Sequence, residues 1–393
     1  MTGTIIKKNI AQLAGGKMDY LRYFKSRQGE MISRLKTLVQ LESPTSDKKA
    51  VDKCSAAVIS ELSSLGIKTK KFPQKEIGDL FLVEYPSAEI KTGEKPLLIL
   101  THIDTVWPVG TIERMPFYLV EDRLYGPGVL DMKAGVVSAM MALKTINNLG
   151  LKLKRKIWLF INSAEETGHE EAHRQIVALA KRAGAALCLE PALPGGALKI
   201  ARKGRLVIKI EACGRSAHAS TPEKGINAIE ELITQWLKIK KLKIKGLTAN
   251  LGLIGGGEKA NVVPEKAWAV VDLRFWTARD LTQIKSFLRE LKPDNRQARI
   301  KTSIVSFTPP MEFTPASREL FARAAGLAST LGLTLTAGRS GGGSDGSIVS
   351  TTGIPVLDGL GPDGDGIHAL DEHLLLPSFI ERTALLTRLL LEL

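Results

Sequence analysis

Several short apolar runs in this chain end in His, Asp or Glu, the side chains that bind divalent metals in proteins. The first run, 97–100, continues as Thr-His-Ile-Asp and so presents His102 and Asp104. Alternation along an extended chain places these two residues on the same side. Asp104 can then accept the second ring N–H of a metal-bound His102. Taken alone, the pattern also fits a histidine at a strand end beside a solvated aspartate.

Four further segments carry residues of the same types. Asp131 follows a Tyr-Gly-Pro-Gly turn and precedes an apolar stretch, so it also fits a helix N-cap. Glu165 and Glu166 follow the run IWLFIN. Two adjacent carboxylates repel each other unless a cation lies between them or the two have separate roles. The alternative interpretation is a solvated loop. Glu190 ends the run AALCLE, and His368 lies among glycines. Together these side chains form a nitrogen and oxygen set suited to two divalent ions, above all zinc.

The expected secondary structure brings these segments to one edge of a sheet. Runs typical of buried strands cover 80–83, 97–100, 157–161 and 186–189, and a helix is expected over 134–149. Strands that alternate with helices favour an α/β domain with a largely parallel sheet and helices on both faces. Ligands of such sheets bind at the carboxyl ends of the strands, which is where the candidate residues lie.

A second, smaller domain interrupts the first. Alternating strands at 206–213 and 267–273, with helices expected over 227–239 and 278–291, predict a compact α+β insert. The α/β pattern then returns, with helices over 317–331 and 378–391 and a strand at 354–357. The predicted organisation is an N-terminal extension (1–29), a catalytic domain (30–202 and 313–393) and an inserted domain (203–312).

Composition excludes several classes of protein. The chain has 393 residues and a net charge of +14, and its cysteines, Cys54, Cys188 and Cys213, form no CxxC pair. Three such cysteines fit a reducing compartment, so we expect a cytoplasmic protein. No apolar run approaches the roughly 20 residues of a membrane span. The basic run 236–245 suggests an anionic partner, but it fits better the exposed end of a helix and a lysine-blocked edge strand, so we expect no nucleic-acid or membrane partner.

The ordered motifs resemble the co-catalytic zinc amidohydrolase family that contains glutamate carboxypeptidase, aminoacylase, acetylornithine deacetylase and succinyl-diaminopimelate desuccinylase. The resemblance runs from about residue 30 to the C-terminus. The motifs are HIDTV, YGPGVLDMKAG, SAEETG, LEP, GRSAHAS, NVVP followed by DLR, GGGSDG and GIHALDE. Glu190 and the GGGSDG segment are most similar to glutamate carboxypeptidase.

The resemblance implies a site for two zinc ions per subunit, with cobalt or manganese as substitutes. The implied ligands are His102 and Glu190 for one ion, Glu166 and His368 for the other, and Asp131 between them. Asp104 would orient His102. Glu165 would be the general base that takes a proton from the attacking water and returns it to the leaving amine.

For the insert, the resemblance implies a lid that also forms a homodimer. His218, an ordinary loop histidine without the resemblance, would reach across the dimer to stabilise the oxyanion. Asn261 and Arg274 match residues that hold the carboxylate of the substrate. Arg339 and Ser344, in the glycine-rich segment GRSGGGSDG, are further candidates for substrate binding.

These implications lead to an expected function with alternatives. We expect a zinc-dependent carboxypeptidase that releases a C-terminal, glutamate-like amino acid from a small peptide. An N-acyl-amino-acid deacylase or desuccinylase would use the same site, and a catalytically inactive scaffold would keep the fold alone. The segment 169–173 also matches the zincin pattern H-E-x-x-H, but that pattern leaves His102, Asp131 and His368 unexplained.

Overall fold

The computed structural model describes residues 18–86 and 94–393, so residues 1–17 of the expected extension lie outside the described part of the chain. The chain divides into two compact units. The first contains the described residues up to Ile200, together with Phe313–Arg339 and Ser344–Leu393. The second contains Ala201–Glu312 and Ser340–Gly343.

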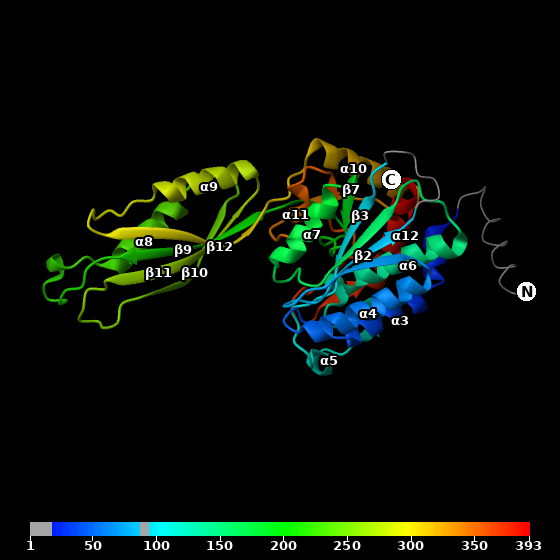
Figure 1. The fold of residues 1–393 in the computed structure, drawn as a ribbon, viewed down its shortest axis with the longest axis horizontal. Coiled ribbons are helices and arrows are strands. Elements are labelled where there is room, and N and C mark those ends of the chain that lie inside the picture. The colour runs from blue at the N-terminus through cyan, green and yellow to red at the C-terminus, as the bar shows by residue number, and fades with distance from the viewer. Residues whose placement is uncertain (1–17, 87–93) are drawn as a thin grey trace, which may run out of the picture. The chain divides into compact units, whose positions relative to one another are not determined.

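The first unit is built on a six-stranded sheet (Figure 1). Its strands, in spatial order, are β1 (Lys68–Phe72), β2 (Leu80–Tyr85), β6 (Ile157–Asn162), β3 (Leu97–His102), β7 (Ala185–Cys188) and β14 (Val356–Leu357). The last four strands are parallel, and β2 runs antiparallel both to β6 and to the edge strand β1. The predicted α/β class with a largely parallel sheet is therefore confirmed.

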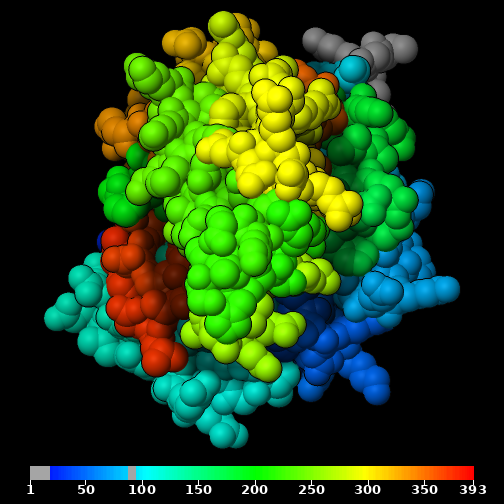
Figure 2. All heavy atoms as spheres, turned by 90° about the vertical axis from the view of Figure 1, so that its left-hand side faces the viewer, coloured from blue at the N-terminus to red at the C-terminus, as the bar shows by residue number. Residues whose placement is uncertain are grey.

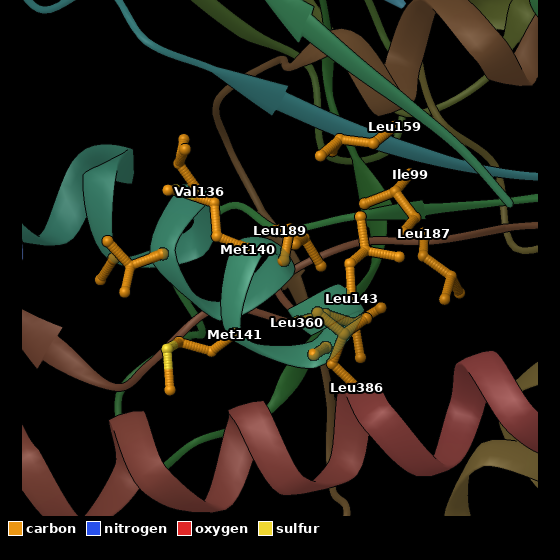
Figure 3. Close-up of a cluster of buried hydrophobic side chains, with 14 of the residues drawn as sticks. Ile99, Val136, Met140, Met141, Leu143, Leu159, Leu187, Leu189, Leu360 and Leu386 are labelled. Carbon is orange, nitrogen blue, oxygen red and sulfur yellow. The ribbon is translucent and has the colours of Figure 1, made fainter. Parts of the chain in front are cut away.

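Helices cover both faces of this sheet. On one face lie α6 (Ala134–Leu149), which has the bounds expected from the sequence, and α12 (Leu376–Glu392). On the other face lie α7 (Glu170–Ala180) and α11 (Asp345–Ser350) (Figure 1). Figure 3 shows Val136, Met140 and Leu143 of α6 in one apolar cluster with side chains of β3, β6 and β7. α6 is therefore buried between the sheet and α12, and its N-terminal end adjoins the turn that carries Asp131.

Three N-terminal helices complete this core: α2 (Tyr20–Lys25), α3 (Gln28–Gln40) and α4 (Lys48–Ser64). α2 packs against α12 and buries Tyr20, Tyr23 and Phe24. Aromatic side chains of this size contribute strongly to a core when they are buried. Residues from Tyr20 onward therefore belong to the packed structure, whereas we expected an extension up to residue 29.

The second unit is a four-stranded antiparallel sheet covered by two helices. The strand order is β10 (Thr248–Gly256), β11 (Lys266–Phe275), β9 (Gly204–Cys213) and β12 (Arg299–Thr308). α8 (Ala228–Lys240) and α9 (Ala278–Glu290) pack on the apolar face of this sheet. The side chains of Asn227 and Thr277 cap the first turns of these helices. The surface of this unit is green to yellow in Figure 2.

The remaining elements are short. A small sheet contains β15 (Gly364–Asp365), β16 (His373–Leu375), β5 (Arg123–Tyr125) and β4 (Tyr118–Val120), and β13 (Ala337–Ser340) pairs with β8 (Leu198–Arg202). The other helices are α5 (Thr111–Arg114) and α10 (Pro315–Ser329), with single turns at Val129–Lys133 and Pro222–Lys224. Across residues 18–86 and 94–393, no helix is both long and apolar enough to cross a membrane.

Candidate active site

Three neighbouring parallel strands end at one edge of the central sheet, and candidate ligands lie at or just beyond each end. β3 ends at His102, which is in register with Asn162 at the end of β6. Glu165 and Glu166 follow β6, and Glu190 follows β7. The carboxyl ends of parallel strands share one edge, so the fold brings together side chains that are far apart in the sequence.

The candidate ligands form two groups that share Asp131. His102 Nε2 lies 3.2 Å from Oδ1 of Asp131 and 3.5 Å from Oε1 of Glu190. His368 Nε2 lies 3.3 Å from the carboxylate of Glu166 and 3.5 Å from Oδ2 of Asp131. Within each group the ligand atoms lie within 4.8 Å of one another. Asp131 thus presents one carboxylate oxygen to each group.

The chemistry of this donor set fits a pair of divalent ions. Imidazole nitrogen and carboxylate oxygen are the ligands of zinc, and manganese and cobalt accept the same set. Acidic side chains outnumber the imidazoles of His102 and His368 in this crowded cluster. The acidic members are Asp104, Asp131, Glu165, Glu166 and Glu190. Divalent cations would balance this excess of buried negative charge.

The pKa values reflect the same crowding. Burial raises the pKa of Glu165 well above its usual range, and the negative charge of Glu190 raises it further. Hydrogen bonds to Asp131 and Glu166 raise the pKa of His368 to about 10. Both shifts have the direction expected where carboxylates crowd together, since neighbouring negative charge disfavours a second carboxylate and favours a charged imidazole.

Asp104 connects the two sides of the site. Its carboxylate lies 3.5 Å from His102 Nδ1, and that ring nitrogen also lies 3.0 Å from the backbone oxygen of Asp104. The backbone N–H groups of Glu165 and Glu166 donate to its two oxygens at 3.2 Å. The Thr45 hydroxyl donates to Oδ2 at 2.7 Å. Asp104 thus holds the His102 ring and the turn that carries both glutamates; the contribution of Thr45 was not predicted.

A second buried pair supports the same turn. Asn162 donates from Nδ2 to Oδ2 of Asp345 at 2.8 Å and accepts the Ala164 backbone N–H at 3.0 Å. Burial raises the pKa of Asp345 to about 7. Asn162 therefore connects α11, through Asp345, to the backbone of Ala164, the residue immediately before Glu165.

The loop that carries Asp131 is fixed by glycine and by Lys133. Gly128 has φ +70°, and a Cβ there would lie 2.5 Å from Cγ2 of Thr105. The fully buried Lys133 donates from Nζ to the carbonyl oxygens of Leu38 at 2.8 Å and Leu41 at 3.2 Å, at the C-terminal end of α3. A cation at this end of a helix is favourable. Lys133 lies within the DMKAG motif, but the sequence does not show which carbonyls it reaches.

His368 lies on a loop with unusual backbone geometry. Its φ is +61°, a region that residues other than glycine seldom adopt. Gly366, at φ +76°, turns the chain two residues earlier. Unlike the buried His102, His368 keeps 46% of its side-chain surface exposed. This loop therefore presents its imidazole at the open side of the two ligand groups.

The predicted lid residues all belong to the second unit, and two of them are neighbours. His218 pairs with Val262 across an isolated bridge, and Ala219 N–H donates to the Asn261 carbonyl at 3.0 Å. His218 Nδ1 accepts the Ser220 backbone N–H at 3.1 Å. A neutral His218 therefore carries its proton on Nε2, the nitrogen left free to donate.

The remaining substrate candidates already have protein partners. Arg274 donates to the Gly341 carbonyl at 2.8 Å and to the Asp272 carboxylate at 3.2 Å. Ser344 is buried at the N-cap of α11 and donates to Asp358 at 2.6 Å. Arg339 lies exposed on β13. Substrate binding by these residues stays a prediction.

The helix boundary at His169 is incompatible with the zincin pattern. His169 is the N-cap of α7, with extended backbone, and its Nδ1 accepts the Glu171 N–H at 3.3 Å. His173 lies inside the helix, so the two imidazoles do not occupy successive turns of one helix as that pattern requires. Among the described residues, neither histidine belongs to a group that could hold a metal.

Known proteins share this sequence pattern and fold. Carboxypeptidase G2 from Pseudomonas sp. strain RS-16 is 28% identical over 352 residues, which cover 87% of this chain and 84% of that protein. Acetylornithine deacetylase from Yersinia pestis is 27% identical over 312 residues, or 73% and 79% of the two chains. The solved structure of aminopeptidase PepT from Bacillus cereus matches with a TM-score of 0.76 at 20% identity, covering 92% of this chain and 98% of that one.

A structure described as a dinuclear metal binding peptidase, from Bacillus subtilis, matches with a TM-score of 0.73 at 15% identity and covers 93% of this chain and 98% of its own. At such identities these two solved structures support the fold alone. The sequence pattern of the family described as Peptidase family M20/M25/M40 matches residues 98–392, most of the chain. The chain therefore belongs to peptidase family M20/M25/M40 and is a hydrolase of the metallopeptidase class.

Proposed function

We propose that this protein is a zinc-dependent carboxypeptidase that hydrolyses an amide bond next to a free carboxylate and releases a C-terminal, glutamate-like amino acid. The observation that carries the proposal is the position of Asp131: its Oδ1 faces His102 and its Oδ2 faces His368. One carboxylate shared by two ligand groups suits a two-ion hydrolytic site.

The chain's own residues divide the work between holding ions and moving a proton. His102 and Glu190 would hold one zinc ion, Glu166 and His368 the other, and Asp131 both. When bound, zinc supplies Lewis acidity that polarises the scissile carbonyl and makes water a better nucleophile.

Glu165 takes the proton of the attacking water and later gives it to the leaving amine. Desolvation and the charge of Glu190 raise the pKa of its carboxyl, which favours taking up a proton that it later returns. Asp104 keeps the His102 ring in place through the contact at 3.5 Å and holds the Glu165 turn through its backbone N–H.

The second unit would supply substrate recognition. An Arg274 guanidinium suits a substrate carboxylate because it offers several donors in one plane. Asn261 would add polar contacts from this unit, and Arg339 would add them from the first unit. His218, with Nε2 free to donate, would stabilise the oxyanion. We propose that it does so in the other subunit of a homodimer formed through this unit.

An N-acyl-amino-acid deacylase is the second candidate function. It is supported by acetylornithine deacetylase from Yersinia pestis, which is nearly as similar in identity to this chain as carboxypeptidase G2. Both reactions cleave an amide bond and would use the same ions and the same base. Cys54, Cys188 and Cys213 form no disulfide with one another, which supports a reducing, cytoplasmic location for either enzyme.

The test is a substrate panel on zinc-loaded protein of measured metal content. N-blocked dipeptides ending in glutamate, leucine or a C-terminal amide are compared with N-acetyl and N-succinyl amino acids. Release of free glutamate from the first peptide, with none from the amide, is the expected result. Hydrolysis of the acyl amino acids alone would establish the deacylase. No turnover at about two zinc ions per chain would instead establish an inactive scaffold.

A further inference from the structure

Glu372 is a buried glutamate that belongs to neither ligand group. Only 1% of its surface is exposed. Its Oε1 accepts the backbone N–H groups of Leu130 at 2.9 Å and Asp131 at 3.1 Å. Its Oε2 accepts the Gly128 N–H at 2.9 Å and the indole N–H of Trp107 at 2.9 Å. A carboxylate offers about four acceptor positions, so these donors use all of them.

The donors belong to segments that carry the candidate ligands. Gly128, Leu130 and Asp131 form the loop of the shared ligand itself. Trp107 lies on the segment that continues from His102 and Asp104. Glu372 follows His368 along the same loop and directly precedes β16, which pairs with β5. A single side chain therefore connects three ligand-bearing segments.

These contacts suit a carboxylate better than an amide. All four partners are N–H donors, so none can accept a proton from this residue. An amide in place of the carboxylate would direct its NH2 group at two of those donors. A carboxylate with its acceptor positions filled by N–H groups is also poorly placed to bind a metal ion. Glu372 can therefore act on the site only through the backbone N–H groups and the Trp107 indole that it holds.

We propose that Glu372 is a positioning residue that fixes the Asp131 loop, and with it the direction in which the two oxygens of Asp131 face the two ligand groups. The inference rests on the proposed two-zinc site. It predicts that Glu372 sets zinc affinity and site geometry without contacting an ion. The DMKAG and GIHALDE motifs contain both ends of this contact, but the sequence does not indicate that they meet.

Zinc binding to the metal-free protein separates positioning from general stabilisation. We compare wild type with Glu372→Gln and Glu372→Asp, by calorimetric titration with zinc and by visible absorption with cobalt. The matched control is Glu231→Gln. Glu231 is also a buried glutamate that accepts two backbone N–H groups, from Asp294 at 3.0 Å and Asn295 at 2.8 Å, but it lies in the second unit.

We expect Glu372→Gln to bind zinc about 10- to 100-fold more weakly at one or both sites, because residues that orient ligands have effects of this size. The cobalt spectrum should change, and Glu372→Asp should restore part of the affinity because it keeps the charge and the acceptors. Glu231→Gln should leave zinc affinity and spectrum unchanged even if its melting temperature falls.

Two outcomes would overturn the inference. The first is a folded Glu372→Gln protein with the zinc affinity and cobalt spectrum of wild type. If this variant does not fold, Trp107→Phe decides instead, because it removes one donor and leaves Oε2 with one partner. Unchanged zinc binding and spectrum in Trp107→Phe is then the second such outcome. A wild-type protein that binds no zinc would refute the proposed site itself, which is a distinguishable result.

Discussion

The backbone N–H of Glu165 donates to Oδ1 of Asp104 at 3.2 Å, the same oxygen that lies 3.5 Å from His102 Nδ1. The proposed base and a proposed ligand are therefore positioned by one carboxylate. This arrangement makes the geometry of the proton-transfer group depend on the residue that orients the imidazole.

Replacing Asp104 by Asn should therefore impair both functions together. The Glu165 and Glu166 N–H groups and the Thr45 hydroxyl all donate to the Asp104 carboxylate. In the Asn variant, the side-chain NH2 group replaces one of the two acceptor oxygens and would face at least one of these donors. We expect zinc affinity to fall about 10- to 100-fold, together with a lower kcat at saturating zinc. Titration and steady-state kinetics measure the two effects. A variant that loses affinity but keeps its full kcat would show that Asp104 orients His102 alone.

Removing the proposed base should separate chemistry from metal binding. Glu165→Gln should lower kcat by about 100- to 10,000-fold, because general acid–base catalysis contributes that much. Zinc content should remain that of wild type, since Glu165 belongs to neither ligand group. Glu170→Gln, an exposed position on α7, is the control. Retained activity in Glu165→Gln would remove this residue from its assigned role.

The Gly-Pro-Gly turn offers a steric test of the Asp131 loop. Gly128→Ala introduces both a strained φ of +70° and a contact of 2.5 Å with Thr105 Cγ2. We expect a loss of about 1–3 kcal/mol in unfolding free energy and weaker zinc binding. Gly150→Ala has a similar φ of +61° with nothing within 4 Å, so it isolates the strain. Adding Thr105→Ser removes the methyl group and should recover part of the loss; no recovery would exclude the steric cause.

The ion cluster around Asp79 predicts a pH dependence of stability. Burial alone would raise the pKa of Asp79, but hydrogen bonds from Lys48 and Lys71 outweigh it and lower the pKa to about 2. A lowered pKa stabilises the fold above the unfolded value of 3.8, and this contribution is lost as the pH falls towards 2.

Asp79→Asn should therefore cost about 2 kcal/mol at neutral pH, with the difference from wild type shrinking below about pH 4. Urea unfolding of both proteins at pH 7 and pH 3 measures it. An equal difference at the two pH values would assign the effect to packing instead of charge.

The second unit contains a buried amide without a hydrogen-bond partner among the described residues, and replacing it should increase stability. Gln235 of α8 is fully buried, and neither Oε1 nor Nε2 has a hydrogen-bond partner among the described residues. An unpaired buried amide costs about 1–3 kcal/mol. Gln235→Met, with a similar volume, should raise the melting temperature of this unit, whereas Gln235→Ala should lower it by leaving a cavity. A lower melting temperature for Gln235→Met would indicate that the amide is satisfied in solution.

The sequence predicts the elements whose burial leaves a strong periodic signal. α6 is apolar along most of its length and is bounded by glycine, so its limits are recovered, and β3 and β6 are continuous apolar runs. β12, with the sequence RIKTSIVSFT, was not predicted because it is an edge strand with most of its residues exposed.

For the site, residue types at strand ends were sufficient to assemble the candidate ligands. The residues that hold those ligands were not accessible in the same way. Lys133, Glu372 and Thr45 act through side-chain contacts with segments distant in sequence, such as Lys133 with the Leu38 carbonyl. Such contacts depend on tertiary packing, which spacing along the chain does not encode.

The position of the second unit within the chain makes the two ligand groups unequal during synthesis. His102, Asp131 and Glu190 precede residue 200, so every residue of the first group is synthesised before the second unit begins. The other group is incomplete until His368 is synthesised, after the whole insertion. The ligands of one group are thus present in the growing chain before the insertion is made. Glu372, which holds the loop of the shared Asp131, and His368 both follow the insertion, so neither group can reach its final geometry until the chain is nearly finished.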